Sequence, residues 1–196
     1  MLKTIASTAA ILLTFVSYIP YIRDILIEKT KPHLYSWLLW GFVSVIVFAL
    51  QLSDGAGVGA FVTLAVALMC FLVIGVSKKM GNVSKVTTSD KIFLVAALVA
   101  LGSWLVSKQP LLSTILATLI GLLGFVPTIR KSWEKPYTET LSFYYLNGLR
   151  FALAVYSLGR YTLITALYPV SWLLAYCLFA LLLIIRRKSV PQPTLT

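Results

Sequence analysis

The chain has 196 residues, of which 59% are hydrophobic and only 12% are charged, and its mean hydropathy is +0.91. A soluble domain of this size keeps about a quarter of its residues charged, so the composition excludes a globule that folds in water. The net charge of +11 would suggest nucleic acid as the partner of a soluble protein. Here the basic residues lie in short segments between apolar runs, where membrane topology explains them and no nucleic acid is needed.

Seven apolar runs are long enough to be transmembrane helices, which need roughly 17–25 residues. In chain order they cover 4–22, 34–52, 56–77, 91–107, 111–129, 141–159 and 162–185. The first run shows no small-residue cleavage site, so we expect a retained helix and not a signal peptide. Pro169 lies inside the last run, where we expect a kink and not a break because membrane helices tolerate proline. The chain is therefore predicted to be an all-α integral membrane protein with seven spans in the lipid bilayer.

The charges in the loops predict the orientation of these spans. Seven spans place thirteen basic residues on one side of the membrane, namely Arg23, Lys29, Lys31, Lys78, Lys79, Lys85, Lys91, Arg130, Lys131, Lys135, Arg186, Arg187 and Lys188. The other side receives only three, Lys3, Lys108 and Arg160. Because loops rich in Lys and Arg stay in the cytoplasm, the N-terminus is predicted outside and the C-terminus inside a plasma or inner membrane.

The sequence also repeats itself at an offset of 107 residues, which superposes Pro20 on Pro127. Further aligned pairs are Ile22-Arg23 with Ile129-Arg130, Gly41 with Gly148, and Cys70 with Cys177. Three helices, one linker helix and three more helices keep both Ile-Arg loops on the cytoplasmic side, as the charges require. The predicted units are a first three-helix repeat with its cytoplasmic loop (1–89), a linker helix (90–109), a second three-helix repeat (110–188) and a cytoplasmic tail (189–196). Parallel repeats of this kind in transporters hold the substrate at their interface.

This 3+1+3 layout resembles the SWEET and PQ-loop transporter clan. Each triplet has a proline near the cytoplasmic end of its first helix, Pro20 and Pro127, and a short basic loop follows. The Pro-Gln pair of the PQ-loop group is Pro-Tyr and Pro-Thr here, and Trp40 and Asn147 stand where SWEET carriers tend to have a proline in the second helix. The resemblance implies a carrier with alternating access, in which Pro20 and Pro127 bend helices at the cytoplasmic gate. Ordinary packing kinks are the alternative for both prolines.

Two spans that the repeat pairs with each other carry aromatic and polar side chains. On the second span, Trp37, Trp40, Ser44 and Gln51 fall within about 60° of arc at 100° per residue. The equivalent span has Tyr144 and Asn147 at the positions that match Trp37 and Trp40. We expect these two faces to line one cavity, in which the substrate-binding residues are Trp37, Trp40, Gln51, Tyr144, Asn147 and Arg150. For Trp37 and Tyr144 the alternative is anchoring at the membrane interface, and for Gln51 it is contact with water.

Arg150 lies near the middle of the sixth span, too deep to reach the membrane surface easily. Inserting an arginine there costs roughly 2.5–3.5 kcal/mol on translocon scales. No Asp or Glu occurs inside any predicted span, so we expect the guanidinium to meet a wet cavity, tyrosine hydroxyls, backbone carbonyls or a bound substrate. Its i, i+3 spacing makes Asn147 a neighbour. A structural arginine that bonds helix-end carbonyls is the alternative.

The sequence favours a transporter over an enzyme. Proton-coupled carriers usually pass protons through acidic or histidine side chains in the membrane, and the one histidine, His33, lies in a loop. Facilitated diffusion of a small polar or anionic metabolite is therefore the first hypothesis, and a receptor or scaffold that binds without transport is the second. No paired acids, histidine cluster or Ser/His arrangement indicates an enzyme.

The two cysteines, Cys70 and Cys177, lie inside apolar runs without CxxC spacing. A disulfide framework or a metal site is therefore not expected, nor is a cofactor. We expect two buried thiols that act as small apolar residues. The sequence leaves homo-oligomerisation open.

Overall fold

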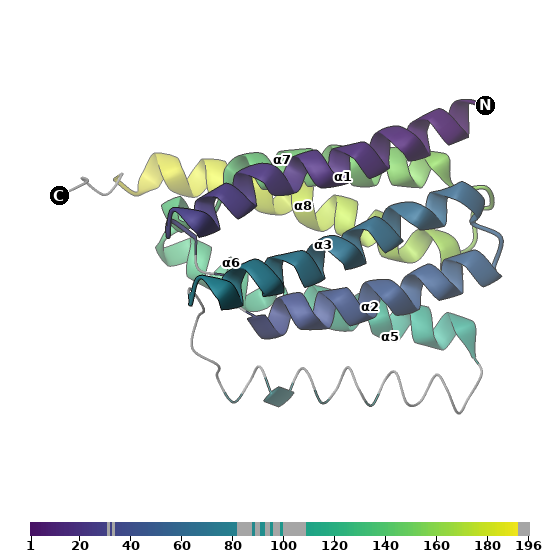
Figure 1. Cartoon of the computed structure of the whole chain (residues 1–196), viewed down its shortest axis with the longest axis horizontal. Helices are drawn as coiled ribbons and strands as arrows, with labels where there is room; N and C mark the ends of the chain where they lie inside the picture. Colours follow the sequence, from purple (N-terminus) through teal and green to yellow (C-terminus); the bar gives the residue numbers. More distant parts are fainter. Residues whose placement is uncertain are drawn as a thin grey trace.

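The computed structural model describes residues 1–30, 32, 34–81, 88, 91, 92, 95, 99 and 109–191. All secondary structure in these ranges is helical (Figure 1). The longer helices are α1 (Leu2–Leu26), α2 (Leu34–Ser53), α3 (Ala60–Lys79), α5 (Pro110–Leu123), α6 (Val126–Glu134), α7 (Leu141–Ser157) and α8 (Leu163–Ser189). Two short 3₁₀ helices are η1 (Gly57–Gly59) and η2 (Pro136–Thr138).

Within the described ranges, five stretches of helix are long and apolar enough to cross a membrane. They are Leu2–Leu26, Leu34–Ser53, Gly57–Lys79, Pro110–Glu134 and Leu163–Ser189. These stretches coincide with five of the predicted spans, and the chain is a multi-pass membrane protein. Helix α7 occupies the sixth predicted span, but its 17 residues make it shorter than the other five. The fourth predicted span, 91–107, falls almost entirely outside the described residues.

The fifth predicted span, 111–129, lies within the stretch Pro110–Glu134, but this stretch is interrupted, because α5 ends at Leu123 and α6 begins at Val126. Pro127 has no N–H to donate to the Leu123 carbonyl, and a proline disfavours helical dihedral angles in the residue before it. The Phe125 N–H instead donates to the Leu122 carbonyl at 3.0 Å. This shorter-range bond tightens the chain between the two helices.

The other two prolines inside predicted spans leave their helices intact. Helix α8 runs unbroken from Leu163 to Ser189 through Pro169, which confirms that the predicted last span is one helix. Pro20 likewise lies inside α1, which continues past the predicted boundary at Ile22. A proline in this chain can therefore accompany an interrupted helix, as Pro127 does, or lie in a continuous one, as Pro20 and Pro169 do. The surroundings of each proline decide which of the two occurs.

The helices run nearly parallel or antiparallel to one another (Figure 1). Helices α1, α3, α5 and α8 run in one direction, and α2 and α7 run in the other. Helix α3 packs against both α1 and α2, and α8 packs against both α5 and α7. Helices α1, α2 and α3 thus form one group, and α5, α7 and α8 form the other. The two groups meet where α1 contacts α7 and where α2 contacts α5. We call the end with the start of α1 and the loops after α2 and α7 the N-side, and the end with the C-termini of α1, α6 and α8 the C-side.

Apolar side chains cover the outside of the bundle, and aromatic and polar side chains fill its middle. Leu174 and Leu178 of α8, for example, are 57% and 66% exposed. Buried polar groups include Ser44, Gln51 and Arg150, all at most 1% exposed. This arrangement suits lipid as the surrounding solvent, because internal polar groups must find their partners inside the protein.

Candidate functional site

Arg150 of α7 is completely buried inside the bundle, with no exposed surface. Its Nε donates to Asn147 Oδ1 at 3.0 Å, so the predicted contact between these two side chains is present. One face of the guanidinium lies over the Phe151 ring, with Cζ 3.8 Å from the ring centroid. Among the described residues, Nη1 and Nη2 have no hydrogen-bond partner. A buried cation with two unused donors is costly unless an acceptor meets it.

Asn147 holds the guanidinium in place through both ends of its amide. Its Nδ2 donates to the Phe143 carbonyl at 2.8 Å, one turn earlier on α7. That bond fixes the direction of the amide, so that Oδ1 faces Arg150. Asn147 therefore positions the arginine, and the bare edge with Nη1 and Nη2 is the part that remains for another group.

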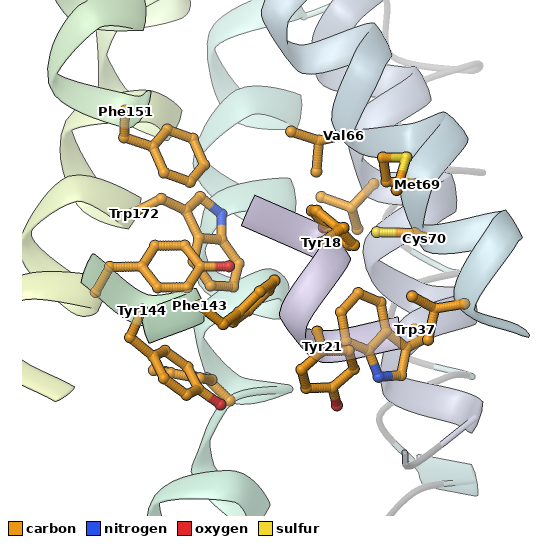
Figure 2. Packing of buried hydrophobic residues seen from close by; sticks show 14 of the residues in the cluster. Tyr18, Tyr21, Trp37, Val66, Met69, Cys70, Phe143, Tyr144, Phe151 and Trp172 are labelled. Carbon is orange, nitrogen blue, oxygen red and sulfur yellow. The ribbon is translucent and has the colours of Figure 1, made fainter. Parts of the chain in front are cut away.

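A small cavity with a volume of about 10 Å³ lies among the helices. This volume holds about one water molecule. Five helices line it, through residues Tyr18, Trp37, Trp40, Val66, Cys70, Phe151, Tyr168, Trp172 and Tyr176. Figure 2 shows Phe151 and Trp172 on one side of this region and Tyr18, Val66 and Cys70 on the other.

The guanidinium lies near several of the residues that line the cavity, although Arg150 itself is not one of them. Arg150 interacts electrostatically with Tyr176, Tyr18, Tyr168 and Cys70, which all line the cavity. The Phe151 ring under the guanidinium lines it as well. The cavity is therefore small and mostly aromatic, and the positive charge of Arg150 lies near the residues that line it.

Two of the predicted binding residues, Trp37 and Trp40, line the central cavity. Trp37 and Tyr144 are each only 3% exposed, so the alternative interpretation of these two as anchors at the membrane interface is wrong. Tyr144 lies away from the cavity lining, and its hydroxyl donates to Glu139 Oε2 at 2.6 Å.

Gln51 is also buried, at 1% exposed, so the alternative of contact with water is wrong. Its Nε2 donates to the Thr165 carbonyl at 3.0 Å, and its Oε1 accepts from Thr63 Oγ1 at 2.8 Å. The Thr165 carbonyl lacks its usual helical donor, because residue 169 of the same helix is a proline. The structure thus places Gln51 outside the cavity lining, where it satisfies a carbonyl that Pro169 has freed.

Trp40 lines the cavity and, like Gln51, also donates to a backbone carbonyl of another helix. Its Nε1 donates to the Gly121 carbonyl at 3.0 Å. In a continuous helix this carbonyl would accept from the Phe125 N–H, which here bonds Leu122 instead. Trp40 and Gln51, on one face of α2, therefore donate hydrogen bonds to backbone carbonyls of α5 and α8 that lack their usual helical donors.

Both ends of the bundle are closed by polar contacts that the sequence did not predict. On the C-side, Asp24 accepts from Thr140 Oγ1 at 2.6 Å and pairs with Arg23, and Glu139 pairs with Lys131 at 2.5 Å. Asp24 and Glu139 are 1% and 5% exposed. They are loop or helix-end acids that fold inward, and neither pairs with Arg150.

On the N-side, the loop after α2 packs directly on the loop after α7. The Gly159 N–H donates to the Ala56 carbonyl at 3.1 Å, and Asp54 accepts from Thr162 Oγ1. A Cβ atom at Gly59 would lie 3.2 Å from the Leu158 backbone, a tight contact, so the close approach of the two loops favours a glycine there. Lys3 Nζ adds a bond to the Leu158 carbonyl at 2.6 Å.

The aromatic residues of α8 and their neighbours in the cavity were not predicted from the sequence. Tyr168, Trp172 and Tyr176 follow one another at a spacing of four, which places them on one face of the helix. This stripe was a usable signal, because aromatic side chains that face the same way in an aliphatic helix indicate an inward face.

The remaining predicted residues fall in different surroundings. Pro20 lies within α1 and Pro127 near the start of α6, and the side chain of Pro127 is outside the described part. Cys70 lines the cavity, whereas Cys177 is exposed, so the prediction of two buried thiols is wrong for Cys177. Within the described part of the chain, no group of three His, Cys, Asp or Glu side chains could hold a metal ion.

Comparisons of the chain with known protein families, with curated proteins and with solved structures found no match.

Proposed function

We propose that the protein is a facilitative carrier for a small polar or anionic metabolite. The observation that carries this proposal is the bare edge of Arg150, two buried guanidinium nitrogens without a hydrogen-bond partner among the described residues. A charge in the middle of a membrane protein usually marks a pathway for a solute, since its burial is otherwise a net cost. The site lies where five helices meet, as in many transporters.

The proposed architecture is seven spans in two parallel three-helix repeats joined by a linker helix. The offset of 107 residues would carry α2 onto 141–160, and α7 spans Leu141–Ser157. It would carry α1 onto 109–133, and α5 and α6 together span 110–134. The helix contacts support the same pairing, because α1·α3, α2·α3 and α1·α7 correspond to α5·α8, α7·α8 and α5·α2. Membership of the SWEET and PQ-loop clan rests on this layout.

The carrier works in this proposal by opening one end of the bundle at a time. The contacts on the N-side and the C-side both close the cavity here, which fits an occluded state between two open ones. The N-side faces outward and the C-side faces the cytoplasm, as the distribution of loop charges favours. Pro20 and Pro127 would bend the helices near the C-side.

The test begins with a thermal-shift screen of metabolites on the purified protein, in the wild type and in Arg150→Leu. A compound that stabilises only the wild type is then offered to proteoliposomes that contain each protein. Saturable uptake of that compound, lost in the variant, supports the carrier. Binding without any uptake would reject it in favour of a receptor or scaffold.

The control for this experiment is Arg160→Leu, which removes an exposed arginine from the loop after α7. Binding and uptake should survive that change. If Arg150→Leu binds and transports like the wild type, the guanidinium takes no part in the function and the proposal fails.

A further inference from the structure

A groove with a volume of about 320 Å³ lies between α7 and α8 on the outside of the bundle. Small-molecule sites in proteins have volumes of about 300–1,000 Å³. At its rim, Tyr145, Leu149 and Leu181 are 51%, 55% and 52% exposed. Within the described part of the chain only α7 and α8 line the groove, through Tyr144, Tyr145, Gly148, Leu149, Tyr176, Cys177, Ala180, Leu181 and Ile184. An apolar surface of this kind on a membrane-crossing helix opens toward lipid.

The helix pair α2 and α3 shows how such a groove can be filled by the chain itself. The offset of 107 residues relates Gly41 of α2 to Gly148 of α7. A Cβ atom at Gly41 would lie 3.0 Å from the Phe71 ring, which therefore covers this glycine. Around Gly148 the nearest described atom is Cys177 Sγ, at 3.6 Å, and no described ring atom lies within 4 Å. The offset pairs Phe71 with Leu178, which does not line the groove. The second helix pair thus leaves open a space that a ring fills in the first.

The groove has the length of one acyl chain and ends at a cation. Along α8 it runs from Tyr176 to Ile184, about 12 Å at 1.5 Å per residue. Half of the hydrocarbon core of a bilayer is about 15 Å thick. Lys188 follows Ile184 by about 6 Å toward the C-side, on the face of α8 that Cys177 and Ile184 share, and it is exposed. An acyl chain in the groove therefore brings its headgroup phosphate next to Lys188.

Charge favours a lipid over a second copy of the chain as the occupant. Basic side chains at the membrane surface attract anionic lipids. Two copies in the same membrane orientation would bring Lys188 of each copy, with Arg186 and Arg187 beside it, toward the same basic residues of the other. Like charges brought together in this way oppose association. The basic end of the groove thus fits an anionic headgroup and disfavours a copy of itself.

From these observations we propose that the groove between α7 and α8 binds an anionic phospholipid of the C-side leaflet, with one acyl chain over Gly148 and the phosphate beside Lys188. The site lies on the outer face of the bundle, away from the guanidinium of Arg150. The proposal therefore stands whether or not the protein is a carrier.

The test for the acyl chain is native mass spectrometry of the delipidated protein, after incubation with equal amounts of phosphatidylglycerol and phosphatidylcholine of the same chain length. We expect the wild type to retain one phosphatidylglycerol in preference. Gly148→Phe should abolish this retention, because its ring takes the place of the chain. Gly75→Phe is the matched control, since Gly75 is an exposed glycine of α3 with open space around its Cβ position. It should retain the lipid like the wild type.

The test for the headgroup compares two exposed lysines at helix ends on the C-side, Lys188 of α8 and Lys79 of α3. Lys188→Gln should reduce the preference for phosphatidylglycerol over phosphatidylcholine about 5-fold, which is the value of one basic side chain near the membrane surface. Lys79→Gln should leave the preference unchanged. Equal effects of the two substitutions, or equal retention of the two lipids by the wild type, would overturn the proposal.

A second readout uses the native thiol of Cys177, which is exposed and lines the groove. Phosphatidylglycerol should slow the reaction of Cys177 with N-ethylmaleimide, measured on its peptide, whereas glycerol 3-phosphate, which has no acyl chain, should not. This readout needs no substitution, so it decides the question even if Gly148→Phe fails to fold. Equal protection by glycerol 3-phosphate would contradict a lipid site. Protection of Cys177 before any lipid is added would show that a second copy or another part of the chain covers the groove, and the proposal would fail.

Discussion

The bond between Gln51 and the Thr165 carbonyl gives the sharpest test of the packing. Pro169 removes the N–H that this carbonyl would accept from, and Gln51 Nε2 lies 3.0 Å away in its place. The perturbation is Gln51→Met, which keeps the length of the side chain and removes its hydrogen bonds. Thr63 loses its acceptor as well, but a threonine hydroxyl can turn to a carbonyl of its own helix. The Thr165 carbonyl has no such escape.

The expected cost follows from that difference. A buried polar group left without a partner costs about 1–3 kcal/mol. In a Pro169→Ala background the restored backbone N–H can satisfy Thr165, so Gln51→Met should cost only the net value of one hydrogen bond, about 0.5–1.5 kcal/mol. The two changes should therefore couple by about 1 kcal/mol, within the range for contacting residues.

The assay is reversible unfolding in mixed micelles of mild detergent and dodecyl sulfate, followed by intrinsic tryptophan fluorescence. The wild type, both single variants and the double variant close one thermodynamic cycle. Ser53→Ala serves as the control, because that hydroxyl bonds only its own helix at the exposed end of α2, and it should stay within about 0.5 kcal/mol. The same cost of Gln51→Met in both backgrounds would refute the explanation through Pro169.

Three further outcomes are expected. Trp40→Phe should lower the free energy of unfolding by about 1–3 kcal/mol in the same assay, because it leaves a carbonyl at the end of α5 without its donor; no loss would contradict that role. Glu139→Ala should speed the labelling of Cys70 by a membrane-impermeant thiol reagent applied from the C-side, since two contacts that close this side are lost; unchanged labelling would show that they form no gate. Cysteines placed at Arg160 and Lys135 should react only from outside and only from the cytoplasm, respectively, and the opposite result would reverse the proposed orientation.

Length and hydropathy were sufficient to predict where most helices begin and end. Helices α2, α3 and α8 follow the predicted spans within a few residues, because lipid imposes a minimum apolar length that is visible in the sequence. The interruption before Pro127 could not be predicted in the same way. A proline breaks a membrane helix or leaves it intact according to the neighbours that take over its freed carbonyl, and those neighbours come from other helices.

The candidate site was predictable in part for a similar reason. The depth of Arg150 in its span and its spacing from Asn147 follow from the chain itself, and the structure shows the two in contact. The roles of Trp40 and Gln51 depend on which carbonyls of α5 and α8 are free, which is a property of the assembled bundle. The sequence showed that these side chains share one face of α2. It did not show which of them lines a cavity and which donates a hydrogen bond to a backbone carbonyl.

These two bonds also constrain how the bundle can open. Trp40 and Gln51 belong to α2, whereas their acceptors belong to α5 and α8, the helices of the other group. A movement of one group against the other must therefore stretch or break these bonds and leave two carbonyls without donors inside the membrane. Such carbonyls are tolerated at that depth only where water reaches them. In the proposed carrier, opening on either side would then be coupled to the entry of water into the bundle, whereas in the structure described here both carbonyls are satisfied without it.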